Sequence, residues 1–219
     1  MGKGKNWYGE RSSAKIPIAT SHLIVCCGAE TEKNYFDGVV KFFKNQEKNM
    51  LLKFYIEVDA VDPMNMANNV LVKTRTIEKK NNCKIDHVWL LFDKDDFSHE
   101  NFNNAINKIQ NTTNEQTKYH ALWSNQCFEL WLLLNFINLT ASISRKAYIQ
   151  KLEKYLQEHY EKNDKDIFDK VLAKGGNLLK AVENAKSLLD DKKTPANNDP
   201  ATKVYEFFEH FEKYLGLTL

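Results

Sequence analysis

The sequence contains few residues of the kinds that mark several common protein classes. Only four of its 219 residues are cysteines, and none of them forms a Cys-x-x-Cys pair or has a histidine at a metal-ligand spacing. The cysteines therefore argue against a zinc site and favour free thiols in a reducing compartment. Arginine is also scarce, with Arg11, Arg75 and Arg145 as its only occurrences. Phosphate contacts should thus depend mainly on lysine or on helix N-termini.

Glycine-rich phosphate loops and long apolar segments are missing as well. No G-x-G-x-x-G follows Gly28, and no G-x-x-x-x-G-K-[ST] motif occurs, so we do not expect the chain itself to bind ATP. The longest apolar stretch, Leu130 to Phe136, is far shorter than the roughly 20 residues that span a bilayer. Residues 1–17 are polar and basic, without the apolar core of a secretory leader. We therefore expect a cytoplasmic protein that does not contact a membrane.

What the sequence does contain is an alternation of short apolar runs and helical patterns. Strands are predicted at 22–28, 53–58, 86–92 and 119–123, with helices between them from about Thr31, over 63–80 and over 99–111. This alternation predicts an α/β fold with a mostly parallel sheet flanked by helices. We expect three parts: a basic mobile tail (1–20), the α/β domain (21–140) and a helical cap packed on it (141–219), with helices at about 145–162, 177–190 and 201–215.

An acidic cluster follows the most apolar of the predicted strands, Val88 to Phe92. Asp93, Asp95 and Asp96 come directly after it. Ligands bind at the carboxyl edge of open α/β sheets, and side chains two apart on a strand point the same way, so Asp93 and Asp95 should face one point. Adjacent carboxylates repel each other unless a cation lies between them, which indicates a hard divalent metal such as Mg²⁺. The alternative is that Asp95 and Asp96 only begin a turn or cap the next helix.

Glu129 is a second unusual residue, because it is the only acidic or basic residue in the apolar run from Cys127 to Phe136. Burying a carboxylate without a partner costs several kcal/mol. Glu129 should therefore either belong to the site at the sheet edge or form a structural hydrogen bond to a neighbouring group. The pattern leaves both alternatives open.

Four ordered motifs resemble those of the RloB-like family, and together they cover nearly the whole chain from Leu23 to about Leu215. They are Leu23-Ile24-Val25-Cys26-Cys27-Gly28 with Thr31-Glu32-x-Asn34-Tyr35-Phe36, Phe92-Asp93-Lys94-Asp95-Asp96-Phe97, Ser124-Asn125-x-Cys127-Phe128-Glu129-Leu130-Trp131-Leu132-Leu133-Leu134, and Asn198-Asp199-Pro200-Ala201-Thr202-x-Val204. The resemblance implies a TOPRIM-type fold, in which a Glu after the first strand and an Asp-x-Asp after the third bind Mg²⁺, or Mn²⁺, for phosphodiester chemistry. It further implies a role in bacterial anti-phage defence, by abortive infection, alongside an AAA-type ATPase partner.

The resemblance assigns roles to individual residues. Asp93 and Asp95 match the metal-binding pair, with Asp96 as a helper. Cys27 stands where the TOPRIM pattern has its Glu, and a thiol does not replace a carboxylate as a hard-metal ligand or as a proton acceptor. Either Glu32 or Glu30 must then reach back into the site, and Glu32 is favoured because it belongs to the matching Thr-Glu pair. Both glutamates could instead serve the helix N-terminus alone.

Two lysines are candidate phosphate contacts beside these acids. Lys33 follows Glu32 directly, and Lys94 lies between the two aspartates, one residue out of phase, so it should face the helix layer rather than a substrate. The leading hypothesis is a magnesium-dependent nuclease that acts on DNA or RNA, with Glu129 as a further catalytic candidate. The alternative is a catalytically weakened module that serves as a partner-binding subunit of the ATPase. A third hypothesis is nucleic-acid binding without cleavage.

Overall fold

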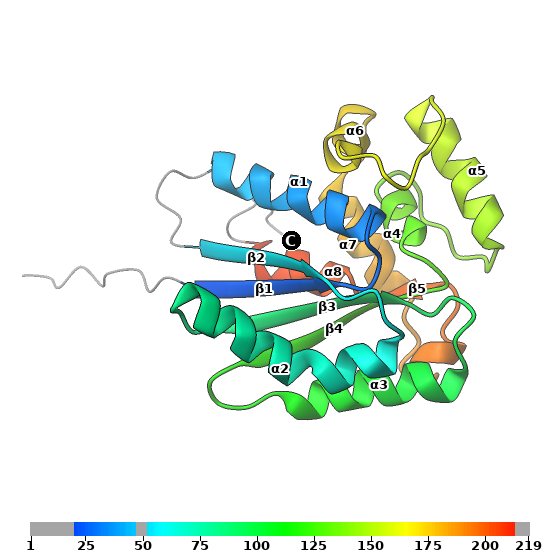
Figure 1. The fold of residues 1–219 in the computed structure, drawn as a ribbon. Coiled ribbons are helices and arrows are strands. Elements are labelled where there is room, and N and C mark those ends of the chain that lie inside the picture. Colours follow the sequence, from blue (N-terminus) through cyan, green and yellow to red (C-terminus); the bar gives the residue numbers. More distant parts are fainter. Residues whose placement is uncertain (1–19, 47–51, 213–219) are drawn as a thin grey trace, which may run out of the picture.

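The computed structural model describes residues 20–46 and 52–212, which form a five-stranded sheet with helices on both faces (Figure 1). The strand order is β2-β1-β3-β4-β5. The pairs β1·β2, β1·β3 and β3·β4 are parallel, which confirms the predicted sheet, and β5 pairs with β4 in the antiparallel sense. The bounds are β1 (Thr20–Cys26), β2 (Leu52–Val58), β3 (His87–Asp93), β4 (Lys118–Asn125) and β5 (Ala201–Thr202). The predicted tail lies outside the described residues, apart from Thr20.

The helices agree with the sequence pattern in the α/β part and less well after it. The three expected there are α1 (Thr31–Gln46), α2 (Pro63–Asn81) and α3 (His99–Thr112). The rest of the chain contributes α4 (Glu129–Leu134), α5 (Arg145–Leu156), α6 (Ile167–Ala173), α7 (Leu178–Ser187), a 3₁₀ turn η1 (Pro195–Asn197) and α8 (Tyr205–His210). The prediction of one helix over 201–215 is wrong at its beginning, because Ala201 and Thr202 form β5; the end of that prediction lies outside the described residues.

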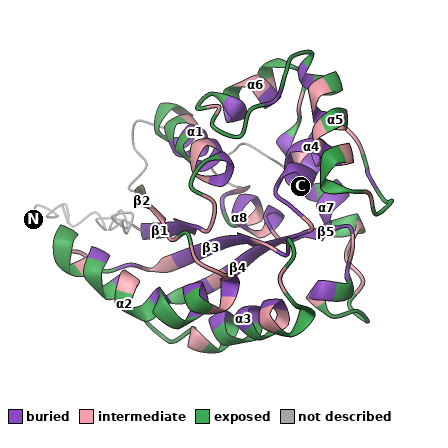
Figure 2. Cartoon of the chain, turned by 45° about the vertical axis from the view of Figure 1, so that its right-hand side comes forward, coloured by how far each residue is buried: buried purple, intermediate pink, exposed green. Residues whose placement is uncertain are grey.

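Each strand sends alternate side chains into two separate cores. Leu23 and Val25 pack with α2 and α3, whereas Ile24 and Cys26 pack with α1 and with α4 to α8. β1 and β3 are almost wholly buried, and the outer faces of α2 and α3 are exposed (Figure 2). Helices from both predicted parts, 21–140 and 141–219, thus share one hydrophobic cluster, and the proposed division between them stays a prediction. No helix in the described part of the chain is both long and apolar enough to cross a membrane.

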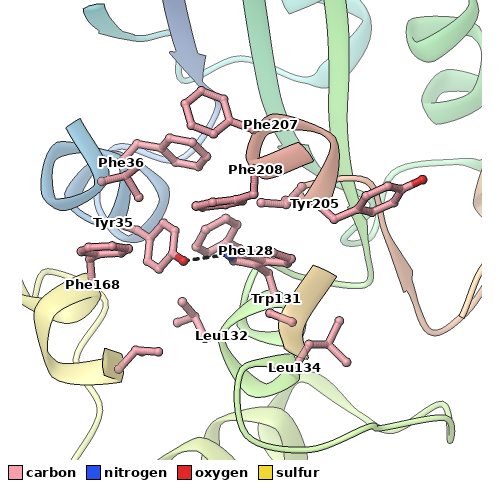
Figure 3. Packing of buried hydrophobic residues seen from close by; sticks show 14 of the residues in the cluster. Tyr35, Phe36, Phe128, Trp131, Leu132, Leu134, Phe168, Tyr205, Phe207 and Phe208 are labelled. Carbon is pink, nitrogen blue, oxygen red and sulfur yellow. Dashed lines mark hydrogen bonds between the residues drawn. The ribbon is translucent and has the colours of Figure 1, made fainter. Parts of the chain in front are cut away.

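Aromatic side chains of α1, α4 and α8 pack against one another in the core (Figure 3). Trp131 Nε1 donates a hydrogen bond of 3.0 Å to the hydroxyl of Tyr35, so both polar atoms are satisfied inside the core. The Trp131 ring also stacks on Phe208, with 5.0 Å between centroids. Because α1 begins beside Glu32 and α4 begins at Glu129, this packing fixes the positions of both glutamates.

Four of the six histidines gather toward the amino-terminal ends of the strands, far along the sheet from those glutamates: His22, His87, His120 and His210. His22 is fully buried, and Trp89 Nε1 donates to its Nδ1 at 3.3 Å. Burial, followed by repulsion from the other three rings, lowers the pKa of His22 to about 2. The folded protein therefore holds this imidazole neutral under conditions in which the unfolded chain would protonate it.

We expect the replacement His22→Gln to make the free energy of unfolding fall less steeply as the pH is lowered. A lowered pKa means that the stability contribution is present above the unfolded value of about 6.5 and is lost as pH falls, by about 1.4 kcal/mol per pH unit. Between pH 6.5 and pH 4.5 the wild type should lose about 2 kcal/mol more than the variant, as measured by urea unfolding at both pH values. His99→Gln, at the exposed start of α3, is the control; equal slopes in all three proteins would contradict the prediction.

Candidate functional site

A pocket of about 460 Å³ opens at the carboxyl edge of the sheet. Its walls come from the segments that follow β1, β3 and β4, and from α5 and the loop after it. β1 lies between β2 and β3, so the chain crosses from β1 to β2 on one side and then passes back over β1 to reach β3 on the other side. In open α/β sheets this switch point is where ligands bind. The sheet topology therefore places the pocket where a functional site is expected.

Glu32, the second residue of α1, folds back over the end of β1. Only 8% of it is exposed, and a Cβ at Gly28 would lie 2.0 Å from its Oε2. Any residue larger than glycine at position 28 would displace this carboxylate. Burial raises the pKa of Glu32 to about 6, backbone hydrogen bonding at Glu32 opposes the shift, and Glu129 adds to it. Glu30 also lines the pocket but is exposed.

Asp93 ends β3 and points into the same pocket. Its Oδ2 accepts a 2.9 Å hydrogen bond from the backbone N–H of Phe128, at the beginning of the α4 segment. Burial raises the pKa of Asp93 well above the usual value, and repulsion from Glu32, Glu129 and Asp95 raises it further. Asp93 therefore shares one pocket with these three carboxylates, and all three disfavour its charge.

Asp95 reaches the pocket for a different reason from the one the sequence suggested. β3 ends at Asp93, and Asp95 lies in the following turn with a φ of 41°, so strand periodicity does not bring the two aspartates together. The turn is held by the hydrogen bond from Asp95 N to Gln126 O, 3.0 Å. Asp95 lines the pocket, whereas the neighbouring Asp96 is exposed and does not. The alternative prediction, that Asp95 and Asp96 begin a turn, is thus confirmed. The turn also brings Asp95 into the pocket lining.

Neither candidate lysine lines the pocket. The ammonium group of Lys94 donates to the backbone carbonyls of Asp95 and Phe97, so it supports the turn from behind. Lys33 pairs with Asp37 along α1. The basic side chains that do line the pocket are Arg145 and Lys162, which the sequence did not single out.

Glu129 is 4% exposed and belongs to the pocket lining. The hydroxyl of Tyr160 donates a 3.1 Å hydrogen bond to its Oε1, and Thr31 Oγ1 lies 3.2 Å from the same hydroxyl. The sequence pattern left open whether Glu129 forms a structural hydrogen bond or lies at the sheet edge, and the structure shows both. The sequence did not indicate Tyr160, because nothing in the polar residues around a tyrosine predicts which distant residues it will contact in the folded protein.

Cys27 lines the pocket as a protonated thiol. Its Sγ donates to the carbonyl of Val61 at 2.9 Å, and burial, with repulsion from Glu32 and other acids, raises its pKa to about 12. This side chain cannot supply the negative charge of the missing glutamate. The carboxylate of Glu32 lies against Gly28, the residue that follows Cys27, so it places a carboxylate next to the position of the thiol.

The acids fit a magnesium ion better than a closely coordinated transition metal. Among the described residues, no three His, Cys, Asp or Glu side chains are arranged to hold a metal ion together. Mg²⁺, however, usually takes only one or two protein carboxylates and keeps several waters. All of the acids that line the pocket offer hard oxygen ligands. Asp93 and Asp95 are the two residues that would hold the ion, and Glu32 lines the same pocket.

Comparison with known proteins adds one finding. A family model described as RloB-like protein matches residues 22–211, a range that contains every pocket-lining residue named above. No curated protein and no solved structure matches the chain.

Proposed function

The chain belongs to the RloB-like family, and on that premise we propose that it is a magnesium-dependent nuclease that hydrolyses phosphodiester bonds of DNA or RNA. The observation that carries the proposal is the gathering of Glu32, Asp93 and Glu129 from three separate segments into one pocket with Asp95. Gathering like charges in one pocket costs stability, and the raised pKa values of Glu32 and Asp93 are of the kind that is characteristic of functional sites.

We further propose that the fold is of the TOPRIM type. In support, the Asp-x-Asp sequence begins at Asp93, the last residue of the third strand, and a glutamate lies against the glycine that follows the first strand. The departure at Cys27 then moves the acidic group from the residue before the glycine to the beginning of α1.

In the proposed mechanism each residue has a defined task. A magnesium ion bound here would supply Lewis-acid chemistry, polarising the scissile phosphate and stabilising the leaving oxygen. Asp93 and Asp95 hold the ion, and the Phe128 N–H fixes the orientation of Asp93. Glu32, whose pKa burial raises to about 6, would take the proton of the attacking water. Glu129, oriented by Tyr160, closes the pocket on the α4 side.

The alternative of a catalytically weakened, partner-binding subunit takes its support from Cys27, which cannot act as a carboxylate. The position of Glu32 favours the nuclease, because a site that had lost its function would not need to keep a second buried acid beside Gly28. A role in anti-phage defence and an AAA-type ATPase partner are proposals that the family resemblance supports.

The direct test is cleavage by the purified chain. We expect it to cut at least one of single-stranded DNA, double-stranded DNA and tRNA with Mg²⁺ or Mn²⁺, and to lose this activity in EDTA, as followed on denaturing gels. Asp95→Ala should reduce the rate by about a hundredfold or more, in the range seen when one group that stabilises transition-state charge is removed. Cleavage that persists in EDTA, or no cleavage of any of the three, would contradict the proposal.

A further inference from the structure

The pocket is too acidic to receive a nucleic acid as it stands. Its lining contains five acidic side chains and two basic ones, Arg145 and Lys162. A phosphodiester carries its own negative charge, so binding it requires both the metal and at least one basic group that turns toward the phosphate. The question is which of the two basic residues can do so.

Arg145 is engaged with the Asp-x-Asp turn. Its two terminal nitrogens donate to Asp95 Oδ1 at 2.8 Å and to Asp96 Oδ2 at 2.6 Å. The guanidinium thus gives one hydrogen bond to each of two carboxylates, and these two terminal nitrogens are the donors with which arginine can bind two oxygens of one phosphate. One of these two carboxylates is a metal-ligand candidate, so Arg145 and the metal ion would compete for Asp95.

The pairing is loose enough to exchange. The side chains of Arg145 and Asp95 are 43% and 41% exposed, and that of Asp96 is 88% exposed. Ion pairs at such exposure contribute little to stability. The backbone of Arg145, in contrast, is fixed, because it begins α5, whose residues Tyr148, Leu152 and Leu156 are buried. The side chain can therefore turn while its Cα stays at the rim of the pocket.

We propose that Arg145 is the phosphate-binding residue of the site and transfers from Asp95 to a substrate phosphate when the metal binds; this inference rests on the proposed magnesium-dependent function. Without metal, Arg145 compensates the charge of Asp95. With Mg²⁺ at Asp95, the charge of this carboxylate would be compensated by the ion, and the Arg145 guanidinium would turn to donate to a substrate phosphate. Metal and phosphate then favour each other's binding, and linkage requires the effect to be reciprocal.

Magnesium titration by calorimetry tests the first half of the exchange. Arg145→Gln removes the competing charge, so it should bind Mg²⁺ about threefold or more tightly than the wild type, in line with the worth of an exposed ion pair. Lys146→Gln, the neighbouring exposed residue outside the pocket, is the matched control and should bind as the wild type does. Unchanged or weaker magnesium binding by Arg145→Gln would overturn the inference. Equal melting temperatures verify folding.

Binding of a phosphorothioate oligonucleotide, which resists hydrolysis, tests the second half. In Mg²⁺, Arg145→Gln should weaken binding of a 12-nucleotide DNA or RNA, whichever the wild type prefers, by about tenfold. It should also reduce the slope of log affinity against log salt by about one, as expected for one lost phosphate contact. A slope and affinity equal to those of the wild type would overturn this inference alone. A wild type that binds neither Mg²⁺ nor oligonucleotide would overturn the proposed function and this inference together.

Discussion

Replacing Asp93 by asparagine should abolish cleavage and at the same time make the metal-free protein more stable. The carboxylate is half-buried beside Glu32, Glu129 and Asp95, all of which raise its pKa. Asparagine removes the charge but keeps an oxygen that can accept the hydrogen bond from Phe128 N. We expect cleavage to fall by about two to three orders of magnitude and the melting temperature in EDTA to rise by a few degrees, corresponding to about 1 kcal/mol.

The pH dependence of this stabilisation follows from the sign of the shift. A carboxyl whose pKa is raised on folding contributes stability below its unfolded pKa of about 3.9 and loses that contribution as pH rises toward the folded value. The advantage of Asp93→Asn should therefore be present at pH 7.5 and disappear near pH 4. Thermal denaturation at both pH values, with EDTA, measures it.

Asp96→Asn is the matched control for Asp93→Asn. Asp96 lies three residues away, outside the pocket, where its exposed carboxylate accepts from Arg145; the same chemical change should therefore leave stability close to that of the wild type and reduce cleavage far less than Asp93→Asn does. If Asp93→Asn lost cleavage together with stability, Asp93 would be a structural residue rather than a ligand. If Asp96→Asn matched Asp93→Asn in both measurements, the assignment of the metal site to the pocket would be wrong.

Much of the fold could be predicted because, in the α/β half, short stretches of sequence carry clear signals of their strands and helices. The run that ends at Asp93 is apolar on both faces, as a central parallel strand requires, and Pro63 begins α2 after Asp62, which caps it. The elements that were missed are short. α6 has only seven residues, and β5 has two, too few for a periodic pattern to emerge.

The candidate site divides in the same way. Asp93 and Glu129 could be singled out because a charge next to an apolar run conflicts with its surroundings. Arg145 and Tyr160 could not, because each is an ordinary residue in a polar segment and acquires its partner only when α5 folds against the sheet edge. The geometry of Glu32 was expected only through the family resemblance, since its contact with Gly28 depends on the close approach of the α1 N-terminus to β1.

Glu32→Gln should reduce cleavage by about a hundredfold, whereas Glu30→Gln should leave it nearly unchanged. The two glutamates are two residues apart and both line the pocket, but Glu32 is buried and Glu30 is exposed. Only Glu32 has a pKa raised to about 6, the property that a general base acting near neutral pH requires. Glutamine keeps the size of the side chain, so the comparison isolates the loss of the carboxylate. Single-turnover cleavage rates of the two variants provide the measurement.

Cys27→Glu tests whether Glu32 replaces the missing glutamate, because it restores a carboxylate at the position where the TOPRIM pattern has one. If Glu32 already supplies the charge, the added acid enters a pocket that is crowded with carboxylates and should change cleavage by less than about threefold while destabilising the metal-free protein. The double variant Cys27→Glu, Glu32→Gln should then recover part of the activity lost in Glu32→Gln. A large gain of cleavage in Cys27→Glu alone would mean that the natural site is weakened and that Glu32 does not take the place of the missing glutamate.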